Sequence, residues 1–209
     1  MTRTIVLATA NPGKLREMRQ VLGDLPVRVA ALDAFPDIDA PEETGRTFEE
    51  NARLKALYYA ERTGRWCLAD DSGLVVDALD GAPGVHSARY AADRVPPDAS
   101  RPQRDAANNA RLLEELEGVP DERRTARFVC CLALAAGGRV LLETTGALEG
   151  RIGRRAAGEN GFGYDPLFLA TGSGRRVAEL PPERKNAISH RGQAVRQFAL
   201  DLGELLEGG

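Results

Sequence analysis

The chain has 209 residues, of which 43% are hydrophobic and 28% charged, and its formal net charge is −3. These values are ordinary for a soluble globular protein, and the length suffices for one substantial core or two lobes that share one. With a negative net charge and no run rich in Lys or Arg, binding to the backbone of a nucleic-acid polymer is not expected. A small anionic ligand held by a few local cations is compatible with this charge.

Targeting and redox features place the chain in the cytoplasm. The first residues lead directly into a strand rather than a signal peptide, and no apolar run approaches the ~20 residues that span a bilayer. Cys67, Cys130 and Cys131 lie in apolar runs without metal-ligand spacing, and their odd number argues against a disulfide framework. We therefore expect a cytoplasmic protein with buried thiols and no membrane segment.

The first loop of the chain has the composition of a phosphate-binding loop. Residues 4–8 predict a buried strand, and residues 15–22 predict a helix that Gly23 ends. Between them lie Thr9, Ala10, Asn11, Pro12, Gly13 and Lys14. Free backbone N–H groups, the helix dipole and the lysine charge would all attract an anion there, although the spacing is not that of a Walker loop. An ordinary strand-to-helix turn with a surface lysine is the alternative.

A second predicted strand, Val27–Ala30, is followed by an acidic segment and a helix. The capping-box pattern of residues 47–50 predicts that this helix runs to about Thr63, where Gly64 stops it. Asn51 and Lys55 lie four residues apart and therefore share one helix face. Most such pairs are only solvated, as are most acidic loops.

Two adjacent carboxylates, Asp70 and Asp71, stand between the apolar runs 66–69 and 74–76. This pattern predicts a strand that ends in two carboxylates at its edge or tip. Neighbouring side chains on an extended strand point to opposite faces, so we expect different partners for the two, one structural and one facing a cleft. An aspartate-rich turn that satisfies its own backbone is the alternative.

The middle of the chain predicts a turn at 80–84, a short helix at 87–90, a surface loop at 91–102 and an amphipathic helix at 103–117. Residues 127–135 predict a long strand, and Gly137 and Gly138 a hairpin turn into a strand at 139–145. Because a hairpin and strand–helix units occur in one chain, we expect a mixed sheet.

A glycine-rich loop at residues 158–166 is the second candidate binding segment. Its glycines allow close backbone approach while exposing a flat ring, which suits stacking on a nucleobase. Aromatic rings tucked into the core are the alternative. Further on, Ser189 and His190 begin a predicted helix to about Leu206, and His190 with the neighbouring Lys185 and Arg191 predicts a polar recognition surface.

Taken together, these segments resemble the family of non-standard purine nucleoside triphosphate pyrophosphatases, the inosine/xanthosine triphosphatases. The motifs that carry the resemblance are TANPGK (9–14), FEENA (48–52), ADDSGL (69–74), GAPG (81–84), GFGYDP (161–166) and SHRGQA (189–194). They occur in the family's order and span nearly the whole chain. Ala10 departs from the pattern, since the family usually carries glycine there, but Asn11 and Lys14 are kept.

The resemblance implies an α/β fold with a long central mixed sheet flanked by helices. It implies one domain over residues 1–209, with two lobes and the active cleft between them. It also implies a homodimer and the Mg²⁺-dependent hydrolysis of dITP, ITP or XTP to the monophosphate and pyrophosphate. Such a reaction needs phosphate charge to be neutralised and a carboxylate that activates water, and both residue types are present.

The resemblance also implies residue roles. Asp71 and Glu42 would hold Mg²⁺, with Asp71 as proton acceptor and Asp70 in support. The implied substrate-binding residues are Thr9, Ala10, Asn11, Pro12, Gly13, Lys14, Asn51 and Lys55 for the triphosphate, Ser72 beside the aspartates, and Phe162, Gly163, Tyr164, Asp165, Lys185, His190 and Arg191 for the base. Phe162 would stack on the ring while the polar residues read its edge.

Base discrimination would come from donor groups. Lys185 and Arg191 can only donate, so they would satisfy the 6-keto oxygen of hypoxanthine or xanthine and oppose the 6-amino group of adenine. Guanine shares the keto group, and the sequence identifies no residue that would exclude it. Two alternatives stay open. Another nucleotide phosphohydrolase would be separated by comparing dUTP, dTTP and dITP, and the paired carboxylates count against a non-catalytic nucleotide-binding module.

Overall fold

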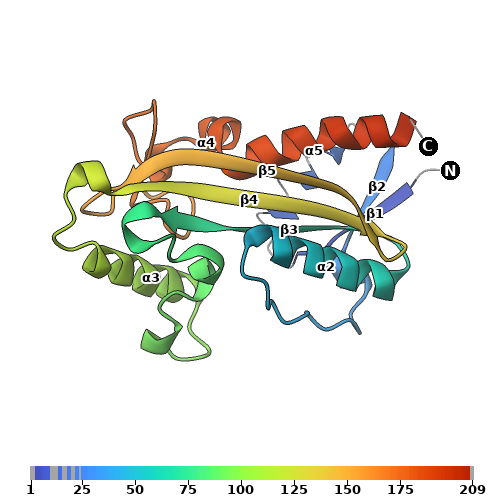
Figure 1. Cartoon of the computed structure of the whole chain (residues 1–209), viewed down its shortest axis with the longest axis horizontal. Coiled ribbons are helices and arrows are strands. Elements are labelled where there is room, and N and C mark those ends of the chain that lie inside the picture. Colours follow the sequence, from blue (N-terminus) through green and yellow to red (C-terminus); the bar gives the residue numbers. More distant parts are fainter. Residues whose placement is uncertain (1–2, 10–13, 16–17, 20–21, 24, 208–209) are drawn as a thin grey trace. The chain divides into compact units, whose positions relative to one another are not determined.

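The computed structural model describes residues 3–9, 14–15, 18–19, 22–23 and 25–207. Its strands are β1 (Arg3–Leu7), β2 (Val27–Ala31), β3 (Trp66–Val76), β4 (Thr125–Ala136), β5 (Arg139–Ile152) and β6 (Phe168–Ala170) (Figure 1). Its α-helices over the described ranges are α2 (Phe48–Thr63), α3 (Arg101–Glu115), α4 (Pro182–Ile188) and α5 (His190–Glu207), together with helical residues between 14 and 22.

The six strands form one mixed sheet in the order β2-β1-β3-β4-β5-β6. Strand β1 is parallel to β2 and β3, whereas β5 and β6 are antiparallel. Gly137 and Gly138 connect β4 to β5 with φ angles of 57° and 75°, the left-handed conformation that a two-residue hairpin requires. The prediction of a mixed sheet in an α/β fold is confirmed.

Two strands continue well past their predicted ends. β3 continues through Asp70 and Asp71 to Val76, so both the predicted strand end and the alternative turn are wrong. Both carboxylates are buried among cations, so the strand can carry them through its centre. β5 continues past Thr145 to Ile152 because its burial keeps alternating through Leu148.

The chain divides into two compact units. Unit one comprises residues 1–72, 130–146 and 191–209, and unit two comprises residues 73–129 and 147–190. Each unit has its own cluster of buried apolar side chains. No helix in the described part of the chain is long and apolar enough to cross a membrane.

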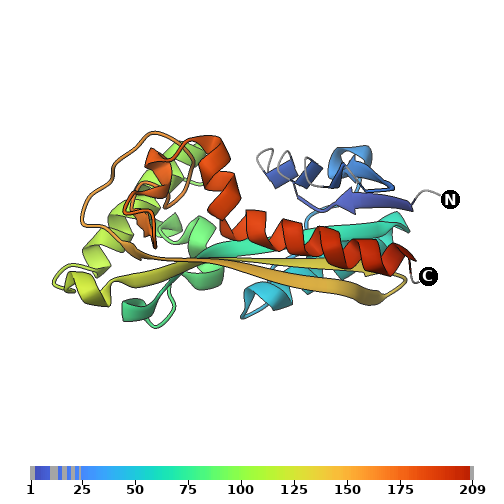
Figure 2. The same ribbon diagram turned by 90° about the horizontal axis from the view of Figure 1, so that it is seen from above.

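In unit one, one face of the sheet packs against α5. Leu7 of β1, Leu68 of β3 and Leu132 of β4 share a buried cluster with Val195 and Phe198 of α5. The opposite face of the strands belongs to α2, where the Thr63 hydroxyl lies 3.2 Å from the sulfur of Cys67. Figures 1 and 2 show α5 and α2 on opposite sides of these strands. Cys67, Cys130 and Cys131 are free and buried, as predicted.

Helix α2 begins and ends largely as predicted. The Thr47 hydroxyl accepts a hydrogen bond from the Glu50 backbone at 3.2 Å, and Gly64 ends the helix with a φ of 63°. The Glu50 carboxylate accepts from the backbone N–H of Arg46 rather than of Thr47, so only half of the predicted capping box forms. Helix α3 carries a full box between Ser100 and Gln103 and begins earlier than predicted.

Unit two is held by an aromatic core. The rings of Phe128 and Phe168 lie 4.5 Å apart, and Leu112 of α3 packs in the same cluster. Tyr164 is also buried there, and its hydroxyl donates to the Ser87 carbonyl at 2.9 Å. These contacts fix the loop that precedes β6 against the sheet and α3.

Candidate functional site

The aspartate pair lies in the middle of β3, beyond the end of its parallel neighbour. β1 stops at Leu7, which is paired with Leu68, and the Ala8 amide donates to the Leu68 carbonyl at 2.8 Å. Asp70 and Asp71 therefore lie at the carboxyl end of β1, the edge where open α/β sheets bind ligands. The two residues are only 2% and 8% exposed.

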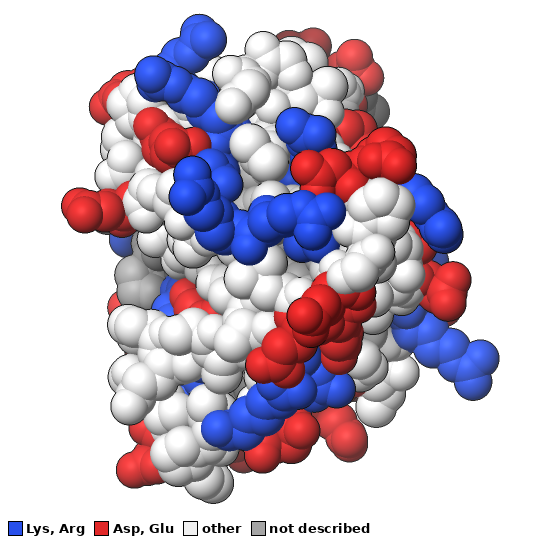
Figure 3. Space-filling model, turned by 90° about the vertical axis from the view of Figure 1, so that its left-hand side faces the viewer, with Lys and Arg blue, Asp and Glu red and all other residues white. Residues whose placement is uncertain are grey.

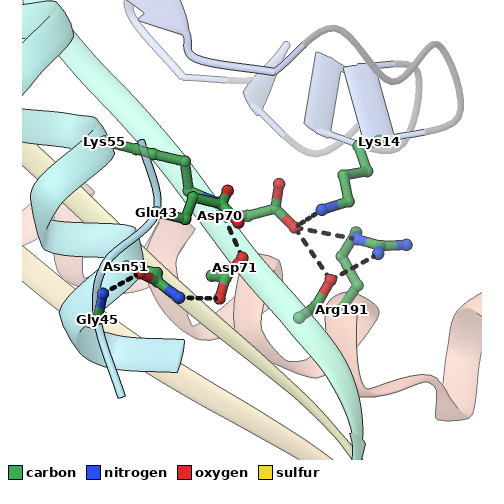
Figure 4. Close-up of polar contacts among 9 residues, drawn as sticks. Lys14, Glu43, Gly45, Asn51, Lys55, Asp70, Asp71 and Arg191 are labelled. Atoms are coloured by element: carbon green, nitrogen blue, oxygen red, sulfur yellow. Dashed lines mark hydrogen bonds and ion pairs between the residues drawn. The ribbon is translucent and has the colours of Figure 1, made fainter. Parts of the chain in front are cut away.

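Asp71 points toward α2. One carboxylate oxygen accepts from the Asn51 amide at 3.3 Å, and the other lies 2.8 Å from Lys55 Nζ (Figure 4). The Asn51 side-chain oxygen in turn accepts from the Gly45 backbone at 2.8 Å. A Cβ at Gly45 would overlap that Asn51 oxygen, so the glycine is needed for this close approach. These contacts hold the Asp71 carboxylate in one orientation.

Asp70 points to the opposite face. Its Oδ2 atom lies 2.6 Å from Lys14 Nζ and 3.8 Å from Nε of Arg191, and it accepts from the Ser72 hydroxyl at 3.3 Å. The Arg191 guanidinium also donates to Ser72 at 3.2 Å. The other carboxylate oxygen of Asp70, Oδ1, is buried without a hydrogen-bond partner among the described residues. The predicted opposite orientation of the two carboxylates is confirmed.

The two carboxyl groups have pKa values shifted in opposite directions. Burial raises the pKa of Asp71, and the charge of Lys55 offsets only part of this effect. Burial acts in the same direction on Asp70, but Lys14 and Arg191 outweigh it and lower the pKa of that group. Asp70 is thus a fixed anion, whereas Asp71 has the greater affinity for a proton. Such a separation suits different catalytic roles.

Glu43 completes this cluster, although the sequence analysis did not select it. Its carboxylate lies 2.8 Å from Lys55 Nζ, so Lys55 is shared by Glu43 and Asp71. Burial alone would lower the pKa of Lys55, but the carboxylates of Asp71, Glu43 and Asp70 together outweigh it and raise that pKa. Glu42 is exposed, because alternate side chains of this extended segment point in opposite directions. Its role as a magnesium ligand stays a prediction.

The structure gathers a second group of predicted site residues within unit two. Lys185 Nζ lies 2.6 Å from the Asp165 carboxylate and 4.7 Å from the centre of the Phe162 ring. The same carboxylate accepts from the Phe162 backbone at 2.9 Å. Gly161 has a φ of 85°, and a Cβ there would overlap Asp165. The loop is therefore built around the buried Asp165.

Helix α3 supplies three contacts to this loop that the sequence analysis did not identify. Asp105 accepts from the Gly163 backbone at 2.8 Å, and Asn109 donates to the Gly163 carbonyl at 2.9 Å. The Arg101 guanidinium lies 4.3 Å from the Phe162 ring centre. Positions 101, 105 and 109 are four residues apart and share one helix face, a spacing visible in the sequence.

Other predicted residues lie in different surroundings. Tyr164 is buried in the core, which leaves its backbone rather than its ring for a ligand. The His190 ring stacks on Phe128 with centroids 5.0 Å apart. Arg191 contacts Asp70 and Ser72, so its guanidinium belongs to the aspartate cluster. Thr9 is the second residue after β1, whereas Ala10, Asn11, Pro12 and Gly13 lie outside the described residues.

Comparisons with known proteins agree with the resemblance seen in the sequence. A model of the Ham1 family matches residues 5–200. A protein of Nitratidesulfovibrio vulgaris named dITP/XTP pyrophosphatase is 55% identical over 93% of this chain and 93% of its own. One of the same name from Listeria monocytogenes is 49% identical over 97% of this chain and 96% of its own. The solved structure of a HAM1 protein from Coxiella burnetii is 44% identical, with a TM-score of 0.87 over 97% of this chain and 100% of its own. The chain therefore belongs to the Ham1 family.

Proposed function

We propose that the protein hydrolyses the triphosphates of non-standard purines, namely dITP, ITP and XTP, to the monophosphate and pyrophosphate. The observation that carries this proposal is the aspartate pair of β3, whose two carboxylates are held among Lys14, Lys55 and Arg191. The names of the relatives at about half identity support the same substrate class. A binding module would have no need for two buried carboxylates with opposite pKa shifts.

Within the aspartate cluster, Asp71 is the proposed general base. Its raised pKa favours taking a proton from water, and Asn51 and Lys55 hold its oxygens in place. Asp70 stays ionised and fixes the ammonium of Lys14 and the guanidinium of Arg191. Those two cations, with Lys55, supply positive charge for the triphosphate. The loop up to Lys14 would add backbone donors, except for Pro12, which has no N–H, and Thr9, whose N–H donates to the Leu7 carbonyl at 2.9 Å.

The donor set near Asp71 fits a magnesium ion. Asp71 and Glu43 already bring two carboxylates to one cation, at 2.8 Å each from Lys55 Nζ. No group of three or more His, Cys, Asp or Glu suited to a metal occurs among the described residues, but Mg²⁺ usually takes one or two carboxylates with waters and phosphate oxygens. Asp71 with Glu42 or Glu43 would hold it. When bound, it would neutralise phosphate charge and favour departure of pyrophosphate.

The second group of residues is proposed to read the base. The Phe162 ring would stack on the purine, and Lys185, steadied by Asp165, would donate to the 6-keto oxygen. The contact of Arg191 with Asp70 favours a role for it on the phosphate side instead. We also propose that the protein is cytoplasmic and acts as a homodimer. Sedimentation analysis would measure its oligomeric state.

The reaction products test the proposed bond cleavage. With Mg²⁺ and ITP, we expect IMP and pyrophosphate, separated by ion-exchange chromatography. Release of IDP with orthophosphate would mean attack at the γ-phosphorus and would contradict the proposal. A panel with dUTP, dTTP and dITP also distinguishes the proposed activity from that of a pyrimidine phosphohydrolase, which would prefer the first two.

Lys185 is expected to control the choice between ITP and ATP. In Lys185→Ala, kcat/KM for ITP should fall far more than for ATP, because the donor that favours a keto group is lost. The neighbouring Arg184 is exposed, so Arg184→Ala removes the same charge without touching the loop. An ITP/ATP ratio that changes equally in both variants, or in neither, would remove Lys185 from base recognition.

Phe162 is expected to affect all purines alike. Phe162→Ala should weaken ITP, XTP and ATP binding together by about 1–3 kcal/mol, the scale of base–aromatic stacking. Steady-state KM values and equilibrium binding without metal measure this loss. Phe162→Tyr keeps an aromatic face and should retain most of the affinity. Unchanged affinity in Phe162→Ala would show that the Phe162 ring does not stack on the purine base.

Asp105 is expected to affect substrate binding indirectly, by holding the loop at residues 158–166 that carries Phe162. Asp105→Ala removes the acceptor of the Gly163 N–H, so the loop loosens and KM for ITP should rise several-fold while kcat changes little. Glu114 lies on the same helix as Asp105, is exposed and pairs with Arg94, which precedes the helix, so Glu114→Ala is a control with normal KM. Faster hydrogen exchange of the Gly163 amide in Asp105→Ala alone would identify the lost contact.

A further inference from the structure

A small pocket in unit two is lined mainly by arginine. It has a volume of about 230 Å³, and Arg151, Arg154, Arg155 and Arg176 surround it together with Asp121 and Gly153. The arginines and Gly153 come from the end of β5, the segment after it and the segment after β6, whereas Asp121 lies in the short helical turn before β4. On the face of the molecule in Figure 3, Lys and Arg side chains gather in a band. None of the pocket residues belongs to the candidate site described above.

Two of the four guanidinium groups are held in place by the protein. Arg154 Nε lies 2.7 Å from the Asp121 carboxylate, and Arg176 Nε donates to the carbonyl of Arg155 at 3.1 Å. Arg176 also lies 3.8 Å from Glu179. Arg154 Nη2 donates to the Val119 carbonyl at 3.4 Å, and the Glu179 contact uses Nη1 of Arg176. Each guanidinium therefore keeps one terminal nitrogen, Nη1 of Arg154 and Nη2 of Arg176, that contacts no acceptor among the described residues. The pocket thus presents two oriented cations.

Gly153 forms part of the wall on which Arg176 lies. A Cβ at this position would come within 3.3 Å of a terminal nitrogen of Arg176 and 3.2 Å of the Leu169 side chain. Both distances are tighter than ordinary van der Waals contact, so any larger residue would press on the guanidinium. The absence of a side chain at Gly153 therefore lets Arg176 lie against the backbone.

A fifth cation lies directly behind this wall. Arg124 is 2% exposed, and its guanidinium donates to the carbonyls of Ile152 at 2.9 Å, Gly153 at 3.2 Å and Leu116 at 2.7 Å. No carboxylate among the described residues forms an ion pair with it. Burial and then the charge of Arg154 lower the pKa of Arg124, against a smaller effect of Asp121. Positive charge is therefore in excess at this point of the protein.

The other two pocket arginines have no partner within the described chain. Arg151 and Arg155 are exposed, and neither side chain forms an ion pair or hydrogen bond with a described residue. Four guanidinium groups thus line one pocket against two carboxylates, that of Asp121 and that of Glu179 beside Arg176, in a protein whose net charge is −3. Concentrating like charges costs free energy unless an anion balances them.

We propose that this pocket binds a small phosphate-class oxyanion, of the size of inorganic pyrophosphate. Guanidinium forks match phosphate oxygens two at a time, so Arg154 and Arg176 would fix the anion while Arg151 and Arg155 close on it. The volume corresponds to roughly eight water molecules and lies below the ~300 Å³ at which pockets for drug-sized ligands begin. It suits a bare oxyanion better than a whole nucleotide.

The test must read this pocket alone, because the cations around Asp70 and Asp71 also attract phosphate. Titration of the ¹⁵N-labelled protein with pyrophosphate, without metal and at constant ionic strength, follows the Gly153 amide and the Arg154 and Arg176 Nε–H signals. We expect saturable shifts in the wild type. In the double variant Arg151→Gln with Arg155→Gln, the dissociation constant should rise at least about tenfold, as loss of charge-assisted contacts implies.

A matched double variant keeps the test specific. Arg123 and Arg175 are exposed, lie in the same unit and do not line the pocket, so Arg123→Gln with Arg175→Gln removes the same charge outside it. Equal weakening in both double variants, or no saturable Gly153 shift up to about 10 mM pyrophosphate, overturns the proposal. So does a Gly153 shift that a single-stranded dT oligomer produces and pyrophosphate does not. Initial rates of ITP hydrolysis should be normal in both double variants.

Discussion

Replacing Asp71 by asparagine is expected to lower kcat for ITP hydrolysis by at least about 10²-fold, the lower range of general-base effects. The substitution keeps the shape of the side chain and its contact with Asn51, but it removes the proton acceptor and the charge facing Lys55. Steady-state kinetics at saturating Mg²⁺ measure the loss. ITP binding without metal should change little, because the cations that hold the phosphates remain.

Asp77 provides the matched control for this experiment. It directly follows β3, is half exposed and pairs with Arg127 at 3.0 Å. Asp77→Asn is therefore the same chemical change at the end of the same strand, and its kcat should equal that of the wild type. Near-normal turnover in Asp71→Asn would remove Asp71 as the base, and a comparable loss in Asp77→Asn would point to a general effect on the strand.

Replacing Asp70 by asparagine is expected to act first on stability. The substitution leaves the buried guanidinium of Arg191 and the ammonium of Lys14 without their carboxylate. Removing one partner of a buried ion pair costs about 3–5 kcal/mol. For a chain of this size, a loss of about 3 kcal/mol lowers Tm by roughly 6–12 °C. Thermal unfolding followed by circular dichroism measures this shift.

The exposed Asp77–Arg127 ion pair is again the control, because it distinguishes the loss of the buried carboxylate from a general effect of an Asp-to-Asn change. Asp77→Asn should cost less than about 1 kcal/mol, because exposed ion pairs contribute little.

The stabilisation that Asp70 provides should depend on pH in the direction given by its pKa shift. The pKa of Asp70 is lowered in the folded state, so its contribution is present above the ordinary aspartate pKa and is lost as pH falls toward the folded value. A stability difference between wild type and Asp70→Asn that does not shrink on acidification would contradict this account.

Local rules predicted much of this fold. The Thr47 cap and the Gly64 stop define α2, and the paired glycines define the hairpin, because each depends on contacts within a few residues. The opposite orientation of Asp70 and Asp71 followed from strand geometry alone. The end of β3 could not be predicted in this way, since two buried carboxylates continue a strand only when cations from distant segments meet them.

The site residues that the sequence analysis missed depend on tertiary contacts. Choosing Glu43 as the partner of Lys55 requires knowing which side of an extended segment faces α2, and composition does not give that. Asp105 and Asn109 showed a regular helical spacing, but nothing in the sequence indicated that Gly163 lies opposite them. Arg191 looked like a base-reading residue by motif, whereas packing of α5 brings it to Asp70.

The division of the chain has a consequence for its synthesis. Unit one is built from three separate segments, and residues 191–209 leave the ribosome after the other two. Phe198 and Leu202 of that segment fill the same apolar cluster as Leu7 and Leu68, so this cluster stays open until then. Asp70 likewise cannot pair with Arg191 until that segment has been made. A nascent chain therefore carries the two carboxylates of β3 long before it can hold them in a finished site.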